Sequence, residues 1–435
     1  MPSQVAKRQY IFQVIRSVFE TYAYVPIETP VMENLSTLTG KYGDEGDQLL
    51  FKVLNNGDYL KNADKDALQD LNSKKLTSSI AKRGLRYDLT VPFARFVTMH
   101  QNDIAFPFKR YQIQQVWRGD RPQKGRYQEF YQCDADVVGS RSLMYEAELL
   151  KIFDEVYHRL GISSIIKLNN RKILFGMADS LGMADKFIDM TVAIDKIDKI
   201  GPEAVQEEMV KRGISQDQAR EVIAMLDIND LDALKSKFSN SETGLKGIEE
   251  LQTVYNYLSK TKTHNPIQFD ISLARGLSYY TGCIFEAECK DVKIGSIGGG
   301  GRYDDLTGSF GLKDVSGVGI SFGAARIYDV MEELDLFPES VNQMLQVLIL
   351  SFDEESHQFA FELLSQLRDK DISADLYPEA AKMKKQMKYA DKIKVPYVLL
   401  IGSNEMESGK FSLKNMQTGE QEDLSVEELI HRFQA

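Results

Sequence analysis

The sequence predicts an α+β protein with more than one domain, and three observations support this. A chain of 435 residues exceeds the length at which a single hydrophobic core keeps growing. Apolar runs at 105–117 and 130–138 have the residue preferences of strands, whereas residues 190–260 are helical in pattern and strongly charged. From residue 345 onward, strand and helix patterns alternate, which is typical of a small α/β domain.

The chain opens with an amphipathic helix pattern that carries charges throughout, which distinguishes it from an apolar leader. A proline-bracketed extended run follows from Pro26 to Pro30. We therefore expect a folded first helix whose apolar face consists of Ile11, Val14, Ile15, Val18, Phe19 and Tyr22.

The charged helical segment interrupts the sheet pattern. Strand patterns resume at 267–289 and again at 315–323, where Val318, Ile320 and Phe322 alternate with small residues. This order predicts one sheet domain with a helical module inserted into it. We expect its first part at 1–190, the insertion at 191–262, its second part at 263–337 and a terminal domain at 338–435.

The terminal domain begins with a linker around 338–344. A buried-strand pattern, QVLILSF, follows, and later segments repeat the alternation of strand and helix. These segments are a helix with Ala360, Leu363, Leu364 and Leu367 in register, a strand at 396–402 and a closing helix near 425–433.

The composition excludes several classes of protein. No apolar run approaches the ~20 residues that span a bilayer, so we expect no membrane segment. The three cysteines have no metal-ligand spacing and fit reduced thiols in the cytoplasm, so no zinc site or disulfide framework is expected. A net charge of −11 argues against indiscriminate nucleic-acid binding, because such binding depends on Lys and Arg that neutralise phosphates. Any nucleic-acid contact must come from local basic patches.

The segment VWRGDRPQKGRYQEFYQCDADVVG, 116–139, combines two strand patterns with a loop rich in arginine, lysine and glycine. Arg118 closes the first strand, and Gln132 and Asp136 share one face of the return strand. Fixed guanidinium groups beside a carboxylate suit a polar substrate that bears phosphate. The structural alternative is a solvated β-hairpin with a basic tip.

This segment resembles motif 2 of the class II aminoacyl-tRNA synthetases, and specifically that of the histidyl-tRNA synthetases. The resemblance implies an antiparallel-sheet catalytic domain of the class II synthetases with a helical insertion, followed by an anticodon-binding domain. Motif 1 implies a homodimer. The further matching segments are ETPVME at 28–33 (motif 1), RYDLTVPFAR at 86–95, LARGLSYYTGCIFEA at 273–287, GSIGGGGRYDDL at 295–306 and GVGISFGAARI at 317–327 (motif 3).

By resemblance, the substrates are L-histidine, ATP and tRNA(His), and Mg²⁺ is expected to accompany ATP without a dedicated metal site in the protein. Asp88 and Thr90 offer oxygen acceptors for the substrate ammonium, although a helix cap is the alternative role for Asp88. The family's histidine-binding positions correspond here to Asp88, Leu89, Thr90, Arg118, Gln132, Asp136, Arg275, Tyr279 and Tyr280, and its ATP-binding positions to Arg118, Asp120, Arg126, Phe130 and Arg326.

Arg275 is notable from its surroundings alone, because a guanidinium within an apolar strand pattern is costly unless it has a partner. In the family this arginine acts on the ATP α-phosphate and on the substrate carboxylate. The resemblance thus makes Arg118 and Arg275 the catalytic pair, with Arg118 on the opposite side of the same phosphate.

Two segments are candidates for contact with tRNA. The loop of motif 2 offers Arg121 and Gln123, and the lysine-rich helix pattern at 382–394 offers Lys385 and Lys388. A solvated basic helix face is the alternative for the second. The run Gly298 to Gly301 lacks the lysine and hydroxyl residue of a P-loop, so close backbone approach explains it better.

Three positions depart from the family pattern: Ser278 replaces Asp in RGLDYY, Asp305 replaces Gly in RYDGL, and Ala325 stands where an acidic residue precedes Arg326. The competing interpretation is a non-catalytic relative, the synthetase-like regulatory subunit of ATP phosphoribosyltransferase. Such proteins typically lack the anticodon-binding domain and the signature arginine, and both are present here. An RNA-binding or kinase-associated regulatory module is a weaker third interpretation.

Overall fold

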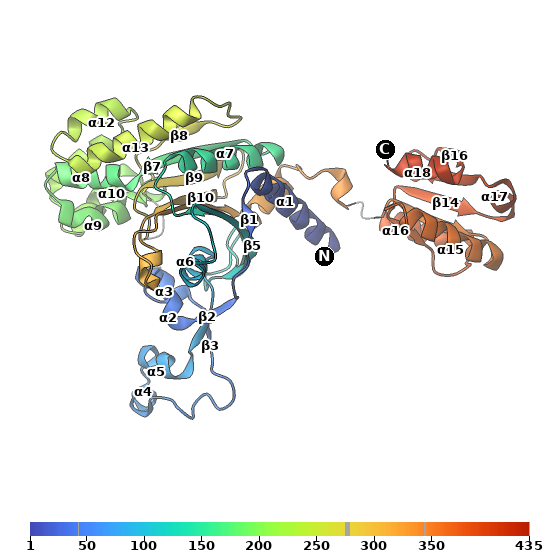
Figure 1. The fold of residues 1–435 in the computed structure, drawn as a ribbon, viewed down its shortest axis with the longest axis horizontal. Helices are drawn as coiled ribbons and strands as arrows, with labels where there is room; N and C mark the ends of the chain where they lie inside the picture. Colours follow the sequence, from blue (N-terminus) through green and yellow to red (C-terminus); the bar gives the residue numbers. More distant parts are fainter. Residues whose placement is uncertain (42, 275–278, 343–344, 435) are drawn as a thin grey trace. The chain divides into compact units, whose positions relative to one another are not determined.

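The computed structural model describes residues 1–41, 43–274, 279–342 and 345–434. The chain divides into two compact units, each with its own sheet (Figure 1). The larger unit is Arg8–Leu336, and the smaller is Phe337–Ala435 together with Met1–Lys7.

The larger unit is built on an eight-stranded sheet in the order β1-β5-β6-β11-β10-β9-β7-β8. Neighbouring strands are antiparallel except for the pairs β1·β5 and β7·β8 at the two edges. The fold class expected for the catalytic domain is therefore confirmed. The strands are β1 (Val25–Pro26), β5 (Phe108–Trp117), β6 (Glu129–Val138), β7 (Ser164–Asn170), β8 (Ile267–Phe269), β9 (Cys283–Cys289), β10 (Ser296–Tyr303) and β11 (Gly317–Gly323).

One face of this sheet is apolar and covered by helices. Phe19 of α1 (Pro2–Thr21) packs against Tyr111 and Phe322, with ring centroids 5.5 and 5.9 Å apart. Phe153 of α7 (Met144–Arg159) meets the same Phe322 edge-on at 4.9 Å. Because side chains alternate between the two faces of a strand, the residues between these apolar ones point to the opposite face of the sheet. Phe12, which the expected helix face omitted, is also buried here.

The opposite face carries an unusual ladder of polar side chains. Three cross-strand pairs between β5 and β6 lie in register, namely Arg110↔Asp136, Gln112↔Asp134 and Gln114↔Gln132. Arg110 is fully buried, and Asp134 and Asp136 are each 2% exposed. Buried charges are costly unless paired, so this ladder marks a face built for polar recognition rather than for a core.

The segment at 267–289 is not the continuous strand that the sequence predicts. Strand β8 ends at Phe269 and β9 begins at Cys283. Between them, the Asp270 carboxylate accepts the Ser272 N–H at 3.0 Å and turns the chain. The Asn169 amide donates to the carbonyls of Ile271 and Leu273, each at 3.0 Å. These side-chain bonds satisfy backbone groups that a neighbouring strand would otherwise pair, which explains the departure from the sheet.

The charged segment is helical, as expected, and α8, which precedes the expected insertion, packs with it. Helices α8 and α13 cross closely, since a Cβ at Gly176 would lie 2.5 Å from the Gly244 Cα. The Ser215 hydroxyl and the Gln218 side chain cap the start of α11 reciprocally. The helices are α8 (Arg171–Ser180), α9 (Phe187–Ile194), α10 (Ile197–Lys211), α11 (Gln216–Leu226), α12 (Leu231–Lys237) and α13 (Glu242–Leu258).

A smaller three-stranded sheet, ordered β2-β4-β3, supports an arm that projects from the larger unit (Figure 1). Its strands are short, and helices interrupt the chain between them. These elements are β2 (Met32–Asn34), α2 (Leu35–Leu38), α3 (Gly43–Leu49), β3 (Lys52–Val53), α4 (Lys65–Gln69), α5 (Ser73–Ile80) and β4 (Arg83–Leu85), after which α6 (Thr90–Met99) returns to the large sheet.

The smaller unit is an α/β domain with a five-stranded sheet in the order β13-β12-β14-β15-β16. Helix α15 buries Ala360, Leu363, Leu364 and Leu367, the register that the sequence predicts. Among the described residues, no helix combines the length and apolar character needed to cross a bilayer. The elements are β12 (Val347–Ser351), α15 (Glu354–Arg368), β13 (Ala374–Leu376), α16 (Met383–Ile393), β14 (Tyr397–Ile401), α17 (Ser403–Ser408), β15 (Phe411–Asn415), β16 (Gln421–Leu424) and α18 (Val426–Gln434).

Candidate active site

A cavity of about 590 Å³ opens on the polar face of the large sheet. Its volume falls within the range of roughly 300–1,000 Å³ that small-molecule sites occupy. The cavity brings together ten of the residues that the sequence predicted for histidine or ATP: Asp88, Thr90, Arg118, Asp120, Arg126, Phe130, Gln132, Tyr279, Tyr280 and Arg326.

Arg118 is held rigidly at the end of β5. Its Nε donates to the Tyr87 carbonyl at 3.1 Å, and its guanidinium carbon lies 4.3 Å from the Tyr87 ring centroid and 5.2 Å from that of Phe130. Stacking between two aromatic rings fixes the plane of a guanidinium and limits the entropy that it loses when it binds an anion. Arg118 therefore presents a preorganised positive charge to the cavity.

Gln132 connects Arg118 to the buried floor of the sheet. The Arg118 Nη2 donates to Gln132 Oε1 at 3.5 Å, and Gln132 Nε2 donates to the Ser321 hydroxyl at 2.8 Å. The Ser321 side chain in turn hydrogen-bonds Asp134, whose Oδ1 has no partner among the described residues. Burial raises the pKa of Asp134 to about 7, with Arg110 opposing the shift and Asp136 adding to it.

Asp136, which the resemblance assigns to imidazole recognition, is not among the described residues that line the cavity. Its Oδ2 pairs with the Arg110 guanidinium at 2.6 Å, and its Oδ1 accepts the Tyr303 hydroxyl at 2.6 Å. The Arg110 contact is an ion pair without hydrogen-bond geometry, so Oδ1 is the Asp136 oxygen that accepts a hydrogen bond. Leu89 is also fully buried and outside this lining.

Asp88 serves as a helix cap and also lines the cavity. Its Oδ1 accepts the Val91 N–H at 3.1 Å, as a cap at the start of α6, and its Oδ2 accepts the Tyr279 hydroxyl at 3.3 Å while the residue faces the cavity. Tyr280 meets Tyr279 edge-on at 5.0 Å. Burial, and then the charges of Asp136, Asp134 and Asp88, raise the pKa of Tyr280, which therefore keeps its proton.

The loop after Arg118 is tied to helix α14 (Ala324–Glu333). Arg326 donates from Nε to the Gly125 carbonyl at 2.9 Å and from Nη1 to the Ser296 carbonyl at 2.6 Å. Lys124 pairs with Glu333 at 2.5 Å, and Asp120 pairs with Arg126 at 3.6 Å. These contacts hold one side of the loop against the cavity. Arg121 and Gln123 are exposed and lie outside the lining.

The glycine run in β10 is explained by close approach, as expected. A Cβ at Gly300 would collide with the Gly319 carbonyl of β11, and one at Gly298 with Tyr157 of α7. At Gly299 the nearest atom is the Phe285 carbonyl at 3.4 Å, and this residue lines the cavity. The glycines thus allow close packing around β10, and because Gly298, Gly299 and Gly300 all line the cavity, this part of its wall has no side chains.

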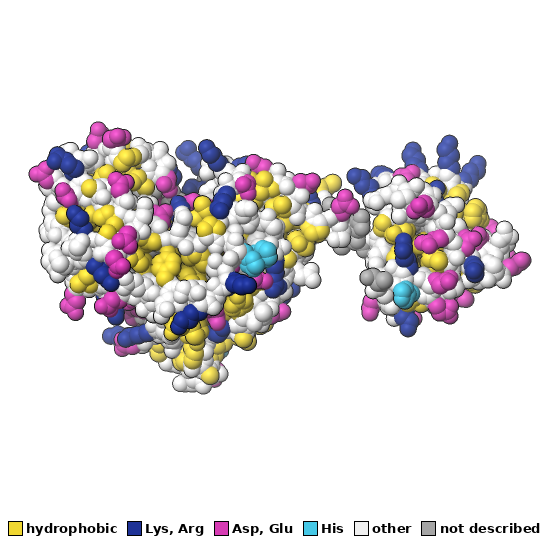
Figure 2. Space-filling view, turned by 90° about the horizontal axis from the view of Figure 1, so that it is seen from above, with side chains coloured by type: hydrophobic (Ala, Val, Ile, Leu, Met, Phe, Trp, Pro, Cys, Tyr) yellow, Lys and Arg dark blue, Asp and Glu magenta, His cyan; other side chains and the backbone are white. Residues whose placement is uncertain are grey.

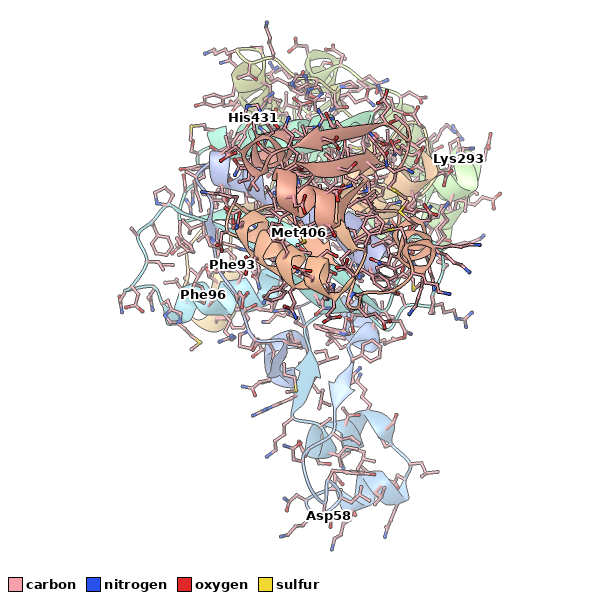
Figure 3. The ribbon with its side chains drawn as sticks, turned by 90° about the vertical axis from the view of Figure 1, so that its right-hand side faces the viewer. Asp58, Phe93, Phe96, Lys293, Met406 and His431 are labelled. Atoms are coloured by element: carbon pink, nitrogen blue, oxygen red, sulfur yellow. The ribbon has the colours of Figure 1, made fainter. Side chains whose placement is uncertain are left out.

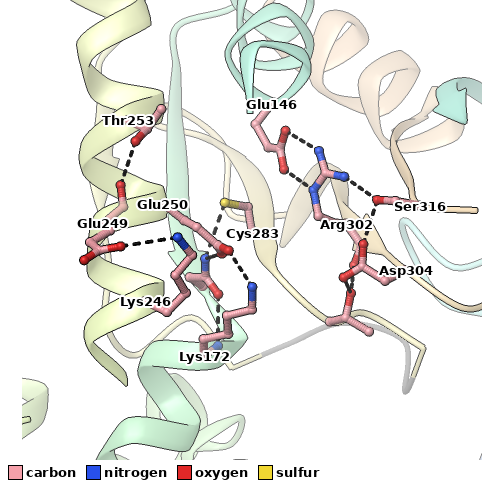
Figure 4. Close-up of polar contacts among 12 residues, drawn as sticks. Glu146, Lys172, Lys246, Glu249, Glu250, Thr253, Cys283, Arg302, Asp304 and Ser316 are labelled. Atoms are coloured by element: carbon pink, nitrogen blue, oxygen red, sulfur yellow. Dashed lines mark hydrogen bonds and ion pairs between the residues drawn. The ribbon is translucent and has the colours of Figure 1, made fainter. Parts of the chain in front are cut away.

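A buried polar network holds the end of β10, just after its glycine run, in place (Figure 4). The Arg302 guanidinium donates to both Glu146 oxygens, at 2.5 and 2.7 Å, and to the Ser316 hydroxyl at 2.5 Å. Ser316 donates to Asp304 at 2.6 Å, and Asp304 accepts from Thr281 at 2.6 Å. This chain of bonds reaches the residue that follows Tyr280, so it supports the cavity from behind.

Arg275 and Ser278 lie outside the described residues. Asp305 is exposed and away from the cavity lining, whereas Ala325 belongs to it. Sequence reasoning missed Arg110, Asp134, Ser321, Tyr87 and Glu286, although the alternation of Arg110, Gln112 and Gln114 with apolar residues in β5 could have revealed the polar face.

A mainly antiparallel sheet with an arginine-bearing loop at its cavity defines the catalytic domain of a class II aminoacyl-tRNA synthetase. The sequence profiles agree, since the histidyl-tRNA synthetase profile matches residues 1–327 and the anticodon binding domain profile matches residues 346–435. The chain therefore belongs to the histidyl-tRNA synthetase family.

Individual relatives support this assignment. The histidine–tRNA ligase of Christiangramia forsetii is 56% identical over 97% of this chain and 94% of its own length. That of Bacteroides fragilis is 54% identical over 99% of this chain and 96% of its own. The crystal structure of histidyl-tRNA synthetase from a Nostoc species superimposes with a TM-score of 0.85 at 30% identity, covering 100% of this chain and 96% of that one.

Proposed function

We propose that this chain activates L-histidine with ATP and transfers it to the 3′ end of tRNA(His). The observation that carries the proposal is the position of Arg118, which is clamped by two aromatic rings and bonded to Gln132 inside the cavity. A fixed positive charge for a phosphate and a set of acceptors for an amino acid thus share one cavity.

In the first step the histidine carboxylate attacks the α-phosphorus of ATP. A new oxygen–phosphorus bond forms, pyrophosphate leaves with its bonding electrons, and histidyl-adenylate results. Positioning and charge stabilisation suffice for such a transfer. Arg118 stabilises the charge that develops on the α-phosphate, and Arg275 is assigned to the opposite side by resemblance.

The amino acid occupies the end of the cavity near Asp88. Asp88 and Thr90 accept from the histidine ammonium with help from Gln132, and Tyr279 and Tyr280 face the imidazole. Because Asp136 pairs with Arg110, accepts from Tyr303 and lies outside the cavity lining, it acts by holding these two residues in place and by its negative charge near Tyr280. Its effect on the imidazole is then indirect. Asp120, Arg126, Phe130 and Arg326 surround the nucleotide.

Mg²⁺ fits this cavity as a companion of the ATP phosphates. The described residues contain no cluster of three or more His, Cys, Asp or Glu side chains that would form a metal cage. Mg²⁺ commonly takes one or two carboxylates together with substrate phosphates and water. Glu286 is one of the carboxylate residues that line the cavity and could serve as such a ligand. The bound ion would neutralise phosphate charge.

In the second step a ribose hydroxyl at the tRNA 3′ end attacks the histidyl carbonyl, and AMP leaves. Residues 338–435 form the anticodon-binding domain in this proposal, 1–190 and 263–337 the catalytic domain and 191–262 its insertion. Lys385 and Lys388 of α16 contact the anticodon side, and Arg121 and Gln123 contact the acceptor end. The enzyme acts as a homodimer in the cytoplasm.

Pyrophosphate exchange with each amino acid in turn tests the proposal. Histidine should support exchange of label into ATP, and exchange with histidine analogues that lack an imidazole N–H should fall by about 10⁴-fold. Arg275→Ala should reduce exchange by about 10²-fold or more. No exchange with histidine would refute the enzyme, and near-normal exchange in the variant would refute the role of Arg275.

A regulatory subunit is the alternative function. A structure described as an ATP phosphoribosyltransferase regulatory subunit/histidyl-tRNA synthetase, from Bacillus halodurans, superimposes with a TM-score of 0.69 at 18% identity over 88% of this chain and 92% of that one. At this identity the likeness concerns the fold alone. The anticodon-binding profile at 346–435 favours the synthetase.

A further inference from the structure

The arm between β3 and β4, residues 52–83, differs in charge from the rest of the chain. We call it the basic arm. It holds seven Lys or Arg residues against four Asp residues, which gives a net charge of +3, whereas the whole chain carries −11. Its lysines at 61, 65, 74 and 82 are exposed. A local positive surface on an acidic protein orients a polyanion toward that surface.

The basic arm has almost no core of its own. Its buried apolar side chains are Ala67 and Ala81, whereas Tyr59 is 41% and Leu71 is 86% exposed. Capping fixes its two helices instead, because Asp64 accepts the Ala67 N–H at 2.9 Å and Asn72 accepts the Lys75 N–H at 3.0 Å. Figures 1 and 3 show it extending away from the large sheet, with Asp58 at its far end.

Both ends of the basic arm lie at the cavity. Shortly before it, Leu49 lines the cavity, and its carbonyl accepts the Gly119 N–H at 2.8 Å, next to Arg118. Shortly after it, the chain reaches Tyr87 and Asp88, which also line the cavity. A backbone bond of 2.9 Å from the Leu85 N–H to the Phe51 carbonyl closes its base. The arm therefore projects from the rim of the site where the adenylate forms.

We propose that the basic arm binds the phosphate backbone of tRNA while the 3′ end enters the cavity. The inference rests on the proposed function, because only a polynucleotide substrate must cross this rim. Lysine side chains supply sequence-independent affinity by neutralising phosphates, and the exposed Tyr59 ring offers a face on which an unpaired base stacks. A solvated arm without a partner is the alternative.

Charge reversal tests the arm. Lys61, Lys65, Lys74 and Lys82 are replaced together by Glu, and a matched control replaces the same four by Arg. Lys75 stays unchanged because it pairs with Asp64 at 3.3 Å, beside the α4 cap. We expect histidine-dependent pyrophosphate exchange, measured without tRNA, to stay within about twofold in both variants. The KM for tRNA in aminoacylation should rise tenfold or more in the Glu variant alone.

Salt dependence gives a second measurement. Each lost phosphate contact should reduce the slope of log KM for tRNA against log salt concentration by about 0.9. A shortened chain, in which a Gly-Ser turn replaces residues 57–78, should reproduce both effects and keep exchange, because that segment lines no part of the cavity. An unchanged KM for tRNA in both the Glu and the shortened variants would overturn the inference, as would an equal rise in the Arg control. Absence of exchange in the unaltered protein would refute the proposed function instead.

Discussion

The Asp134 carboxyl is enclosed beneath the candidate active site, so its titration is coupled to folding. Its pKa is raised from the ordinary 3.8 to about 7, first by burial and then by Asp136, against the opposing charge of Arg110. Between about pH 4 and pH 7 the folded protein therefore holds a proton that the unfolded chain has released. The contribution of Asp134 to stability falls as the pH rises through this window and stays low above it.

Asp134→Asn should remove this pH dependence, because the amide keeps the shape and does not ionise. The free energy of unfolding of the unaltered protein, relative to that of the variant, should decrease from pH 5 to pH 7 by up to about 1.4 kcal/mol per pH unit. Urea unfolding followed by tryptophan fluorescence measures this in the larger unit alone, because the single tryptophan, Trp117, lies in β5. Parallel pH curves for the two proteins would contradict the prediction.

Individual residues show where sequence reasoning succeeds and where it stops. Arg118, Gln132 and Asp88, which the resemblance assigned to the substrates, all line the cavity. Asp136, also assigned to the substrate by resemblance, has the protein partners Arg110 and Tyr303 and lies outside the cavity lining. Those partners come from β5 and β10, and their approach depends on strand register, which the local sequence does not determine.

At the scale of elements, the hydrophobic periodicity and the length of a segment determined whether its secondary structure could be predicted from the sequence. Strands β5 and β6 and helices α15 and α16 form where their patterns predict them, and each of the two helices buries one face. Strand patterns were recognised across 267–289, but the chain forms β8 and β9 at the two ends of this segment. Its break at Asp270 results from side-chain bonds with Ser272 and from Asn169 of β7, a residue far away in sequence.

Helix α16 presents an exposed row of lysines above a packed face. Gln386 and Ala390 are buried, and Met383 and Met387 pack against the core of the smaller unit. Figure 2 shows Lys and Arg side chains gathered along one edge of this unit. Lys385 pairs with Glu379 at 2.8 Å, but both side chains are more than half exposed, so this ion pair contributes little to stability. A phosphate can therefore replace Glu379 as the partner of Lys385 at little cost.

Lys385→Glu with Lys388→Glu should therefore raise the KM for tRNA by about tenfold, because two attractive charges become repulsive. Pyrophosphate exchange should not change. Steady-state aminoacylation at several tRNA concentrations gives the measurement. Lys370→Glu with Lys410→Glu makes an equal charge change at exposed sites of the same unit and serves as the control. The anticodon-side role fails if the two double variants behave alike.

For the whole molecule, the candidate active site lies within one of the two compact units. All of the residues that line the cavity lie between Gly46 and Arg326, inside the larger unit. The smaller unit encloses its own cores, one of which includes Val347, Leu363 and Phe411. The sequence could indicate this division through its linker and its change of pattern, because compact units with their own cores produce such boundaries.

A chain that ends at residue 342 should therefore keep histidine-dependent pyrophosphate exchange within a few fold. Its KM for tRNA should rise by about 10²-fold, because the contacts of one of two linked binding modules are lost. Trp117 fluorescence and circular dichroism establish that the remaining sheet is folded, and fragment 345–435 added separately is the control for covalent linkage. Loss of exchange in a folded truncated chain would show that histidine activation requires the smaller unit. Unchanged tRNA kinetics would instead remove that unit from tRNA recognition and leave the larger unit, with its basic arm, as the whole of the tRNA-binding surface.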